Sequence, residues 1–424
     1  MRASDDVRPT QTKVKHQVLD EYLKAWTGII FWGIRHSRKF VSTSPRFVYV
    51  DAFSFKGKYT GGDMDSPRKD SVYGSPVIGI QRLDKFTKYA SKNGMPVITN
   101  VILLEKNPET YQLLKETLEE IGVGHRVRET TDFGSLRNGE IAVANVDATK
   151  MGDKLIAYTS QQYIWSFYLL DPWGPSGIPY EFVQKIVSAP RHDVMINFIY
   201  IAFQKNLGLI RKQQLGPREQ SKLDLWEKVF GPEIWSKIVY AYRNKLLTGK
   251  REKTEVTQGS VVKYLDTLQS MDPEIAVKLT ALQFPDKRRE MLYLFLTTHD
   301  PTGALKLNEV LAEARLLEFE LRHRARIAKP IRRGQMSLFP FDEISSGIES
   351  LDSSRPDIEE IGNTIMKLFA GQTVQLKYIY KKLADTDYFP GEVQKTLKIL
   401  RRKKRANFEG SALSNRTWIT FRNE

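Results

Sequence analysis

Apolar runs that alternate with amphipathic stretches dominate the first half of this chain and restrict the folds open to it. Strand-like runs lie at 47–51, 97–105, 141–147, 163–171 and 194–201, and helical spacing of apolar residues occurs at 14–35, 76–91, 108–121 and 179–188. Continuously apolar strands between helices are typical of a parallel sheet that is covered on both faces. We therefore predict an α/β core.

The second half of the chain changes pattern. Residues 203–285 are basic and mostly helical in spacing, which predicts a helical insertion before a late strand at 291–298. We expect the α/β domain to comprise residues 1–326, and the composition of 327–358 is that of a linker. Residues 359–424 have the three helices and the wing of a C-terminal winged-helix domain.

Charge and cysteine content restrict the class of protein. The 424 residues include 65 Lys and Arg against 50 Asp and Glu, a net charge of +15, which favours an anionic partner, with nucleic acid ahead of a membrane surface. The absence of cysteine excludes disulfides and thiolate metal sites and fits a reducing compartment. No apolar run has the length of a membrane span, and Met1–Asp6 contain no signal core. We expect a cytoplasmic protein without a membrane partner, and no metal, because the six histidines have no ligand spacing.

Acidic residues that end successive strands predict a cofactor site, because ligands of open α/β sheets bind outside the carboxyl ends of the strands. Asp51 can bind a cofactor amine, and Phe53 and Gly57 lie in the turn that follows it. Glu105 can accept both hydroxyls of a ribose, and Asp147 can accept from an adenine amino group. The chain lacks a three-glycine phosphate loop, so the pattern favours S-adenosylmethionine over a dinucleotide. Any one of these acids taken alone is more commonly a helix cap or a surface residue.

The fourth strand-end acid begins a segment suited to chemistry on a planar substrate, Asp171-Pro172-Trp173-Gly174. Asp171 can accept from an exocyclic amine, Pro172 fixes the turn, Trp173 offers a stacking surface, and Gly174 allows close approach to the backbone. This set suits a nucleobase. The alternative is a strand-to-helix turn in which Asp171 is only a cap.

At these residues the chain resembles the three-Cys-motif partner (TcmP) family of methyltransferase-like proteins. The resemblance covers about residues 15–325 and rests on Tyr49-Val50-Asp51-Ala52-Phe53, Gly74-Ser75-Pro76, Leu104-Glu105-Lys106-Asn107-Pro108, Leu170-Asp171-Pro172-Trp173-Gly174 with Gly177-Ile178-Pro179, and Leu294–His299 with Pro301 and Gly303. It implies a Rossmann-like class I methyltransferase sheet that binds S-adenosylmethionine. It also implies a partner protein with a three-cysteine motif of the radical-SAM type.

Asp171-Pro172-Trp173-Gly174 also resembles the Asp-Pro-Pro-aromatic motif of methyltransferases that modify amino groups in nucleic acids. This likeness implies that Asp171 orients the target amine and that Trp173 stacks on its base. Phe55, however, stands where the first glycine of the methyltransferase loop is expected and could crowd the methionine end of the cofactor. Two functions stay open: a methyltransferase acting on an amino group of a nucleic-acid base, or a non-catalytic adaptor that binds nucleic acid or a three-cysteine partner.

Two further features leave alternatives open. The basic run Arg401-Arg402-Lys403-Lys404-Arg405 ends the third helix of the predicted winged helix, where it could contact phosphates while the helix enters a major groove. The alternative is a protein-docking winged helix whose basic end faces water. His299 follows the late strand and could face the cofactor site or be a structural histidine.

Overall fold

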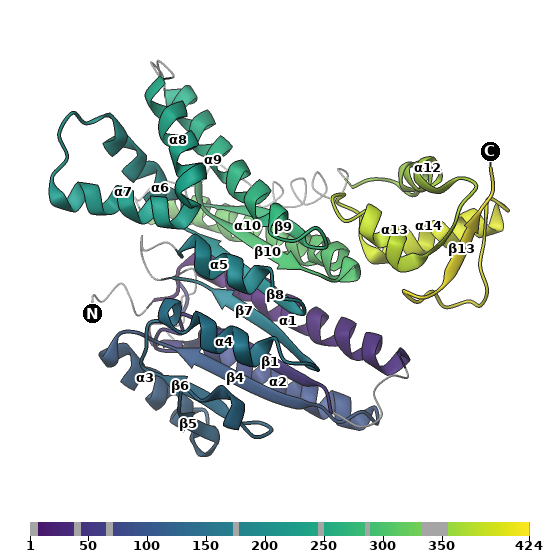
Figure 1. Cartoon of the computed structure of the whole chain (residues 1–424), viewed down its shortest axis with the longest axis horizontal. Helices are drawn as coiled ribbons and strands as arrows, with labels where there is room; N and C mark the ends of the chain where they lie inside the picture. Colours follow the sequence, from purple (N-terminus) through teal and green to yellow (C-terminus); the bar gives the residue numbers. More distant parts are fainter. Residues whose placement is uncertain are drawn as a thin grey trace.

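A computed structural model of the chain describes residues 7–37, 44–64, 71–172, 178–244, 250–284, 289–332 and 355–423. Within these residues an eight-stranded sheet has the order β5-β6-β4-β1-β7-β8-β10-β9 (Figure 1). Its strands are β1 (Arg46–Asp51), β4 (Ile98–Leu104), β5 (Val127–Glu129), β6 (Ile141–Ala144), β7 (Ile164–Leu170), β8 (His192–Phe198), β9 (Ala276–Gln283) and β10 (Glu290–Thr298). The strands from β5 to β8 in the sheet pair in parallel, and β10 is antiparallel to both of its neighbours. The predicted α/β core with a mostly parallel sheet is confirmed.

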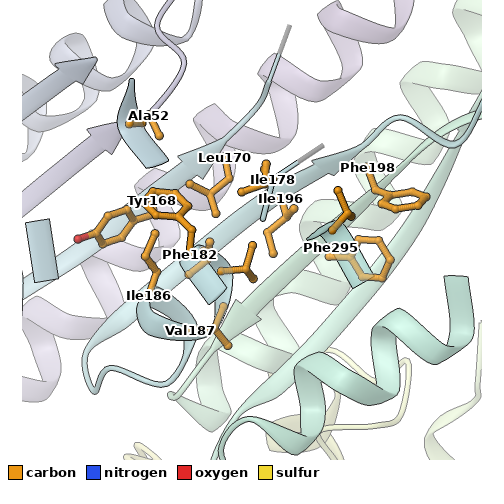
Figure 2. Close-up of a cluster of buried hydrophobic side chains, with 14 of the residues drawn as sticks. Ala52, Tyr168, Leu170, Ile178, Phe182, Ile186, Val187, Ile196, Phe198 and Phe295 are labelled. Atoms are coloured by element: carbon orange, nitrogen blue, oxygen red, sulfur yellow. The ribbon is translucent and has the colours of Figure 1, made fainter. Parts of the chain in front are cut away.

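Helices cover both faces of the sheet because its central strands are apolar on both. Phe47 and Tyr49 pack with α1 (Thr10–His36), α2 (Ser75–Lys92), α3 (Pro108–Glu120) and α10 (Pro301–Arg332) on one face. Val48 and Val50 belong to the core on the other face, which is covered by α4 (Gly152–Thr159) and α5 (Tyr180–Val187). Figure 2 shows part of this second core, in which Leu170 and Ile196 lie close to Ile178 and Phe182.

Between β8 and β9 the chain forms α6 (Tyr200–Leu207), α7 (Pro217–Phe230), α8 (Pro232–Asn244) and α9 (Lys250–Ser270). Helix α7 packs on the sheet through Trp226 and Phe230, whose rings each lie 5.8 Å from that of Phe198 on β8. The helical insertion predicted for 203–285 is therefore present, but its last part, Ala276–Gln283, is strand β9. The error has a physical cause: β9 is the edge strand, and its polar Lys278 and Thr280 weaken the apolar signal.

The C-terminal unit consists of α12 (Ile358–Phe369), β11 (Thr373–Gln375), α13 (Leu376–Lys382), α14 (Pro390–Arg402), β12 (Ala406–Asn407) and β13 (Trp418–Phe421). Its strands form an antiparallel sheet in the order β11-β13-β12. Its helices and sheet enclose a separate core, which Leu305 of α10 also joins. Most of the predicted linker, 333–354, lies outside the described residues, and α10 extends to Arg332.

Two kinds of feature are absent from the part of the chain that the structure describes. Among its helices, none combines the length and the low polarity that crossing a bilayer requires. In the same ranges no cluster of three or more His, Asp or Glu side chains is arranged to hold a metal ion.

Candidate functional site

The order of the core strands places the topological switch point of the sheet between β1 and β7. When the short edge strand β5 is left out, the parallel strands follow the chain in the doubly wound order 3-2-1-4-5, which reverses between β1 and β7. Ligands of such sheets bind outside the carboxyl ends of the strands at this point. Asp51 is the last residue of β1 and Asp171 comes directly after β7, so both predicted acids lie there.

Strand alternation directs the polar strand ends to one face. Asp51, Asp171 and Asn197 each follow by two residues a member of the core beneath α1, namely Tyr49, Leu169 and Met195. Because side chains two residues apart in a strand share a face, all three project towards α1. The register of β1 and β7 agrees with this direction, because Asp51 pairs with Leu169, which belongs to the core beneath α1.

Asp171 is held by side chains from two other elements. Asn197 Nδ2 on β8 donates to Asp171 Oδ1 at 2.6 Å, and the Lys15 ammonium on α1 forms an ion pair with Oδ2. The Lys15 residue is only 7% exposed, and the Asp171 side chain is 16% exposed. A carboxylate oxygen can accept two hydrogen bonds, so each oxygen of Asp171 retains capacity for another donor.

Asn197 also presents a buried acceptor. Its Oδ1 has no hydrogen-bond partner among the described residues, although the residue is only 6% exposed. An ion-paired carboxylate only accepts, so the amide nitrogen must face Asp171 and Oδ1 is left over. Buried acceptors are normally satisfied, which makes this atom a position for a ligand donor.

Asp51 lies in a fully buried polar cluster. Tyr49 Oη donates to Asp51 Oδ2 at 3.2 Å, and Phe53 N donates to Oδ1 at 3.3 Å. Burial raises the pKa of Asp51 to about 7; a hydrogen bond from Ser75 opposes this rise, and the charge of Asp171 adds to it. Near neutral pH the Asp51 carboxyl can therefore either donate or accept a hydrogen bond.

Glu105 follows β4, where sequence analysis placed the ribose ligand. Its Oε2 accepts from Phe55 N at 2.9 Å and its Oε1 accepts from Asn107 N at 2.7 Å. Burial raises the pKa of the Glu105 carboxyl, and hydrogen bonds from the backbone of Asn107 and Phe55 counteract that rise. Glu105 thus fixes the loop after β1 against the loop after β4.

The loop after β1 contains two residues in the left-handed conformation, Phe55 at φ 52° and Gly57 at φ 75°. A Cβ at Gly57 would lie 3.1 Å from the Leu114 side chain and 3.2 Å from that of Thr117, both on α3. Gly57 is therefore required for the close approach of the loop to α3, and its contact with a cofactor stays a prediction. Phe53 is partly buried and packs against the core on the α5 face.

Asp147 caps the short 3-10 helix at Ala148–Lys150. Its Oδ1 accepts from Thr149 N at 3.1 Å and from Thr149 Oγ1 at 2.7 Å, and Lys106 Nζ lies 2.8 Å from Oδ2. Burial would raise the pKa of Asp147, but hydrogen bonds from Lys106 and Thr149 outweigh it and hold the pKa below the usual value. The side chain is 20% exposed, so a ligand can still reach it.

The rest of the predicted catalytic segment is described only in part. Pro172 is buried directly after Asp171. Trp173 and Gly174 lie outside the described residues, so their stacking and backbone roles stay predictions.

The start of α1 and a small hairpin lie over the carboxyl end of the sheet. The hairpin pairs β2 (Lys58–Tyr59) with β3 (Val72–Tyr73), and the ring of Tyr59 lies 6.2 Å from that of His16. Burial raises the pKa of the Tyr59 hydroxyl, and the nearby charge of Asp171 raises it further, while Arg8 lowers it. The two strand-end acids of β1 and β7 are therefore close to this hairpin.

His299 lies at the opposite edge of the sheet. β10 runs antiparallel to β8, so its end meets the start of β8, where His299 Nδ1 lies 3.2 Å from the carbonyl oxygen of His192. The structural role left open for His299 is the one observed.

The predicted basic run is divided by its contacts. Arg401 Nη1 donates to the carbonyl oxygen of Gly410 at 2.6 Å, and its guanidinium lies 4.7 Å from the centre of the Phe408 ring. Arg402, Lys403 and Lys404 are exposed, whereas Arg405 is half-buried beside β12. Four of the five predicted cations are therefore exposed, and Arg401 among them is engaged by Gly410 and Phe408.

Sequence analysis missed Lys15 and Asn197 as partners of Asp171. Asn197 had a signal, because it is a polar residue at the end of the apolar run Val194-Met195-Ile196-Asn197. Lys15 had a weaker one, as a basic residue on the largely buried part of the first helix.

Comparisons with known proteins give little guidance. No family model and no curated protein matches the chain. A structure of a Legionella pneumophila protein described under family DUF519 is 11% identical over 67% of this chain and 85% of its own, with a TM-score of 0.31. A structure from Galdieria sulphuraria, titled as a candidate sarcosine dimethylglycine methyltransferase, is 9% identical over 66% of this chain and 83% of its own, with a TM-score of 0.21. At these TM-scores neither likeness supports a function.

Proposed function

We propose that this protein is an S-adenosylmethionine-dependent methyltransferase that acts on an amino group of a nucleic-acid base. The observation that carries the proposal is the position of Asp171 at the switch point of the sheet, where Lys15 and Asn197 hold it from two other elements. A Rossmann-like class I methyltransferase sheet is part of the proposal. It is supported by the doubly wound strand order and by the antiparallel β10 beside β8. The resemblance to the TcmP family belongs to the same proposal.

The carboxyl edge of the sheet fits an adenosyl cofactor in its donor and acceptor chemistry. Each oxygen of Glu105 holds one backbone N–H and keeps a lone pair for a ribose hydroxyl. Asp147, which follows β6, keeps similar capacity for an adenine amino group, and Asp51 ends β1, the strand beside β4. S-adenosylmethionine would supply an electrophilic methyl group at this edge. Methyl transfer of this kind needs no cysteine. A chain without cysteine suits a reducing compartment, so the proposal includes a cytoplasmic location.

Asp171 and Asn197 would orient the substrate. A primary amine has two N–H groups. Asp171 can accept a hydrogen bond from one of them, and the unpartnered Oδ1 of Asn197 can accept one from the other. Holding both protons fixes the direction of the nitrogen lone pair, and such positioning supplies much of the acceleration of a transfer reaction. Lys15 keeps the Asp171 carboxylate in place, and Trp173 would stack on the base.

We assign the C-terminal unit to the winged-helix class on the order of its elements. One helix, one strand, two helices and two strands form a small core under an antiparallel sheet, which supports the assignment. The unit carries 14 Lys and Arg against 7 Asp and Glu between residues 355 and 423, which supports nucleic acid as its partner.

Transfer of a labelled methyl group tests the proposal. Wild-type protein, Asp171→Ala and a control with an exposed acid removed, Asp153→Ala, would be incubated with S-adenosylmethionine and with DNA or RNA in single-stranded and duplex form. We expect Asp171→Ala to abolish transfer while S-adenosylhomocysteine affinity stays within about twofold of wild type, since the side chain orients the substrate. Retained transfer in Asp171→Ala would remove Asp171 from the mechanism.

A second candidate is a non-catalytic partner of a three-cysteine protein of the radical-SAM type. The left-handed Phe55 in the loop after β1 favours it, because its ring stands where a methyltransferase has glycine. Co-purification discriminates between the two candidates: a stoichiometric iron–sulfur partner without transfer activity supports the second, and an active isolated chain supports the first.

A further inference from the structure

The turn between α13 and α14 is fastened to the main domain. Lys278 Nζ on β9 donates to the carbonyl oxygen of Thr386 at 2.8 Å. Asn308 Nδ2 on α10 donates to the carbonyl oxygens of Thr386 at 2.9 Å and Tyr388 at 2.8 Å. Lys278 and Asn308 are both buried, and burial lowers the pKa of Lys278. The C-terminal unit is thus docked through this turn, beside α10 in Figure 1.

The start of α14 carries an acid, Glu392, and is covered by Arg355. The Arg355 guanidinium donates to both carboxylate oxygens of Glu392, at 2.7 and 2.6 Å, and lies 3.4 Å from the centre of the Phe389 ring. In helix-turn-helix proteins the N-terminal residues of this helix contact base edges in the major groove. Here a paired acid stands at that end of α14, next to a turn that faces β9 and α10.

The hairpin between β12 and β13 is likewise turned towards the main domain. Asn415 Nδ2 donates to Thr302 Oγ1 at the start of α10, and Arg416 Nη1 donates to the carbonyl oxygen of His36 at the end of α1, both at 2.8 Å. The wing and the start of α14, the two parts that a winged helix commonly offers to DNA, are therefore both engaged with other parts of this chain.

The C-terminal part of α14 is exposed and carries several basic side chains. Lys395, Lys398 and Arg402 are exposed at helical spacing, and exposed Lys403 and Lys404 follow them. We call these five residues the α14 ridge. None of them has an acidic partner among the side chains that the structure describes. At 1.5 Å per residue, the helical part of the ridge is about 10 Å long.

We infer that the α14 ridge binds the phosphodiester backbone of a nucleic acid and does so without reading its base sequence. Lysine and arginine on a helix surface contact phosphates through charge, and such contacts carry no sequence information. Since we take this polymer to be the substrate of the methyltransferase, the inference rests on the proposed function. It adds that base choice belongs to the Asp171 site and that the C-terminal unit supplies affinity.

The test is a binding measurement on the full chain by fluorescence anisotropy. The probes are two 30-bp DNA duplexes of unrelated sequence, with single-stranded DNA and duplex RNA of one sequence as further arms, each titrated over a range of salt concentrations. The ridge variant is Lys395→Gln/Lys398→Gln/Arg402→Gln. The matched control is Lys85→Gln/Lys88→Gln/Lys92→Gln, which removes three exposed lysines with the same spacing from α2.

We expect the ridge variant to bind both duplexes on the order of tenfold or more weakly, by the same factor for each. The slope of log affinity against log salt should fall by about 3, and the α2 variant should bind as wild type. Equal affinity of the ridge variant and wild type, an equal loss in both variants, or a loss for one sequence only would overturn the inference. Calorimetry with S-adenosylhomocysteine on the same preparations keeps the two proposals apart, because a failure of cofactor binding concerns the methyltransferase and not the ridge.

Discussion

Lys15 and Asp171 form an ion pair between the first helix and the end of β7, 156 positions apart in the sequence. Helix α1 crosses the sheet from the carboxyl edge, where Lys15 lies, towards the start of β1, where Trp26 packs at 5.6 Å on Phe47. The position of the candidate catalytic acid is therefore coupled to the packing of α1 on the sheet.

Lys15→Met should destabilise the protein by about 3 kcal/mol, because it leaves the largely buried carboxylate of Asp171 without its cationic partner. Asp171→Asn removes that charge, so the double variant should recover most of the loss. Urea denaturation of the wild type, both single variants and the double variant forms a double-mutant cycle. Additive effects would show that the pair has no energetic coupling.

Gly79→Ala should destabilise the protein by about 1–3 kcal/mol through overpacking. Gly79 lies on α2 against the ring of Tyr49, and a Cβ at this position would overlap that ring. Tyr49 in turn donates to Asp51, so the site should be disturbed as well. The control is Gly28→Ala on α1, where no atom lies within 4 Å of the new Cβ and where alanine should stabilise the helix by up to about 1 kcal/mol. Thermal melts that rank the two variants in the opposite order would contradict the packing of Gly79 on Tyr49.

Asp193 should make stability depend on pH between about 4 and 7. Tyr22 Oη donates to Asp193 Oδ2 at 2.6 Å, and burial raises the pKa of Asp193 to about 7 from 3.8. The folded state then holds a proton that the unfolded state has lost. This contribution to stability is complete below pH 4 and is lost as the pH rises to 7.

Asp193→Asn removes this titration. Its free energy of unfolding relative to wild type should rise between pH 4 and pH 7 by on the order of a few kcal/mol. Asp51 titrates in the same range in both proteins, so the difference between the two curves isolates Asp193. Parallel curves would mean that Asp193 is ionised in the folded protein throughout.

Phe55 gives a prediction about the cofactor loop. A side chain in the left-handed region costs roughly 1–2 kcal/mol relative to glycine, and Phe55 adopts φ 52°. If its ring crowds the cofactor, Phe55→Gly and Phe55→Ala should both bind S-adenosylhomocysteine more tightly than wild type, with the glycine variant the more stable of the two. Weaker binding in both variants would instead make the ring part of the binding surface.

The strands that were predictable from sequence are those buried on both faces. β1, β4 and β7 are mostly apolar, with Thr99, Asn100 and Ser166 as interior exceptions, and their parallel pairing follows from the helices between them. β9 was not predictable as a strand because its outer position in the sheet allows Lys278 and Thr280 to interrupt the pattern. The three-residue β5 is too short to give any signal.

The site was predictable as a set of strand ends but not as a set of contacts. The alternation of side chains along a strand and the order of the strands suffice to bring Asp51 and Asp171 together. They do not predict that Glu105 accepts hydrogen bonds from Phe55 N and Asn107 N. A sequence does not distinguish a carboxylate that fixes a loop from one that binds a ribose. The partner Lys15 depends on how α1 lies on the sheet, which no local pattern encodes.

Calorimetric titration of the full chain with S-adenosylhomocysteine tests the central claim most directly. We predict one site per chain with micromolar affinity, and a loss of at least tenfold in Glu105→Gln, which removes a carboxylate acceptor placed for the ribose. The control is Glu116→Gln, which changes an exposed acid on α3 and should leave the affinity unchanged. Wild-type protein that shows no heat of binding up to millimolar ligand would contradict a cofactor site at the carboxyl edge of the sheet.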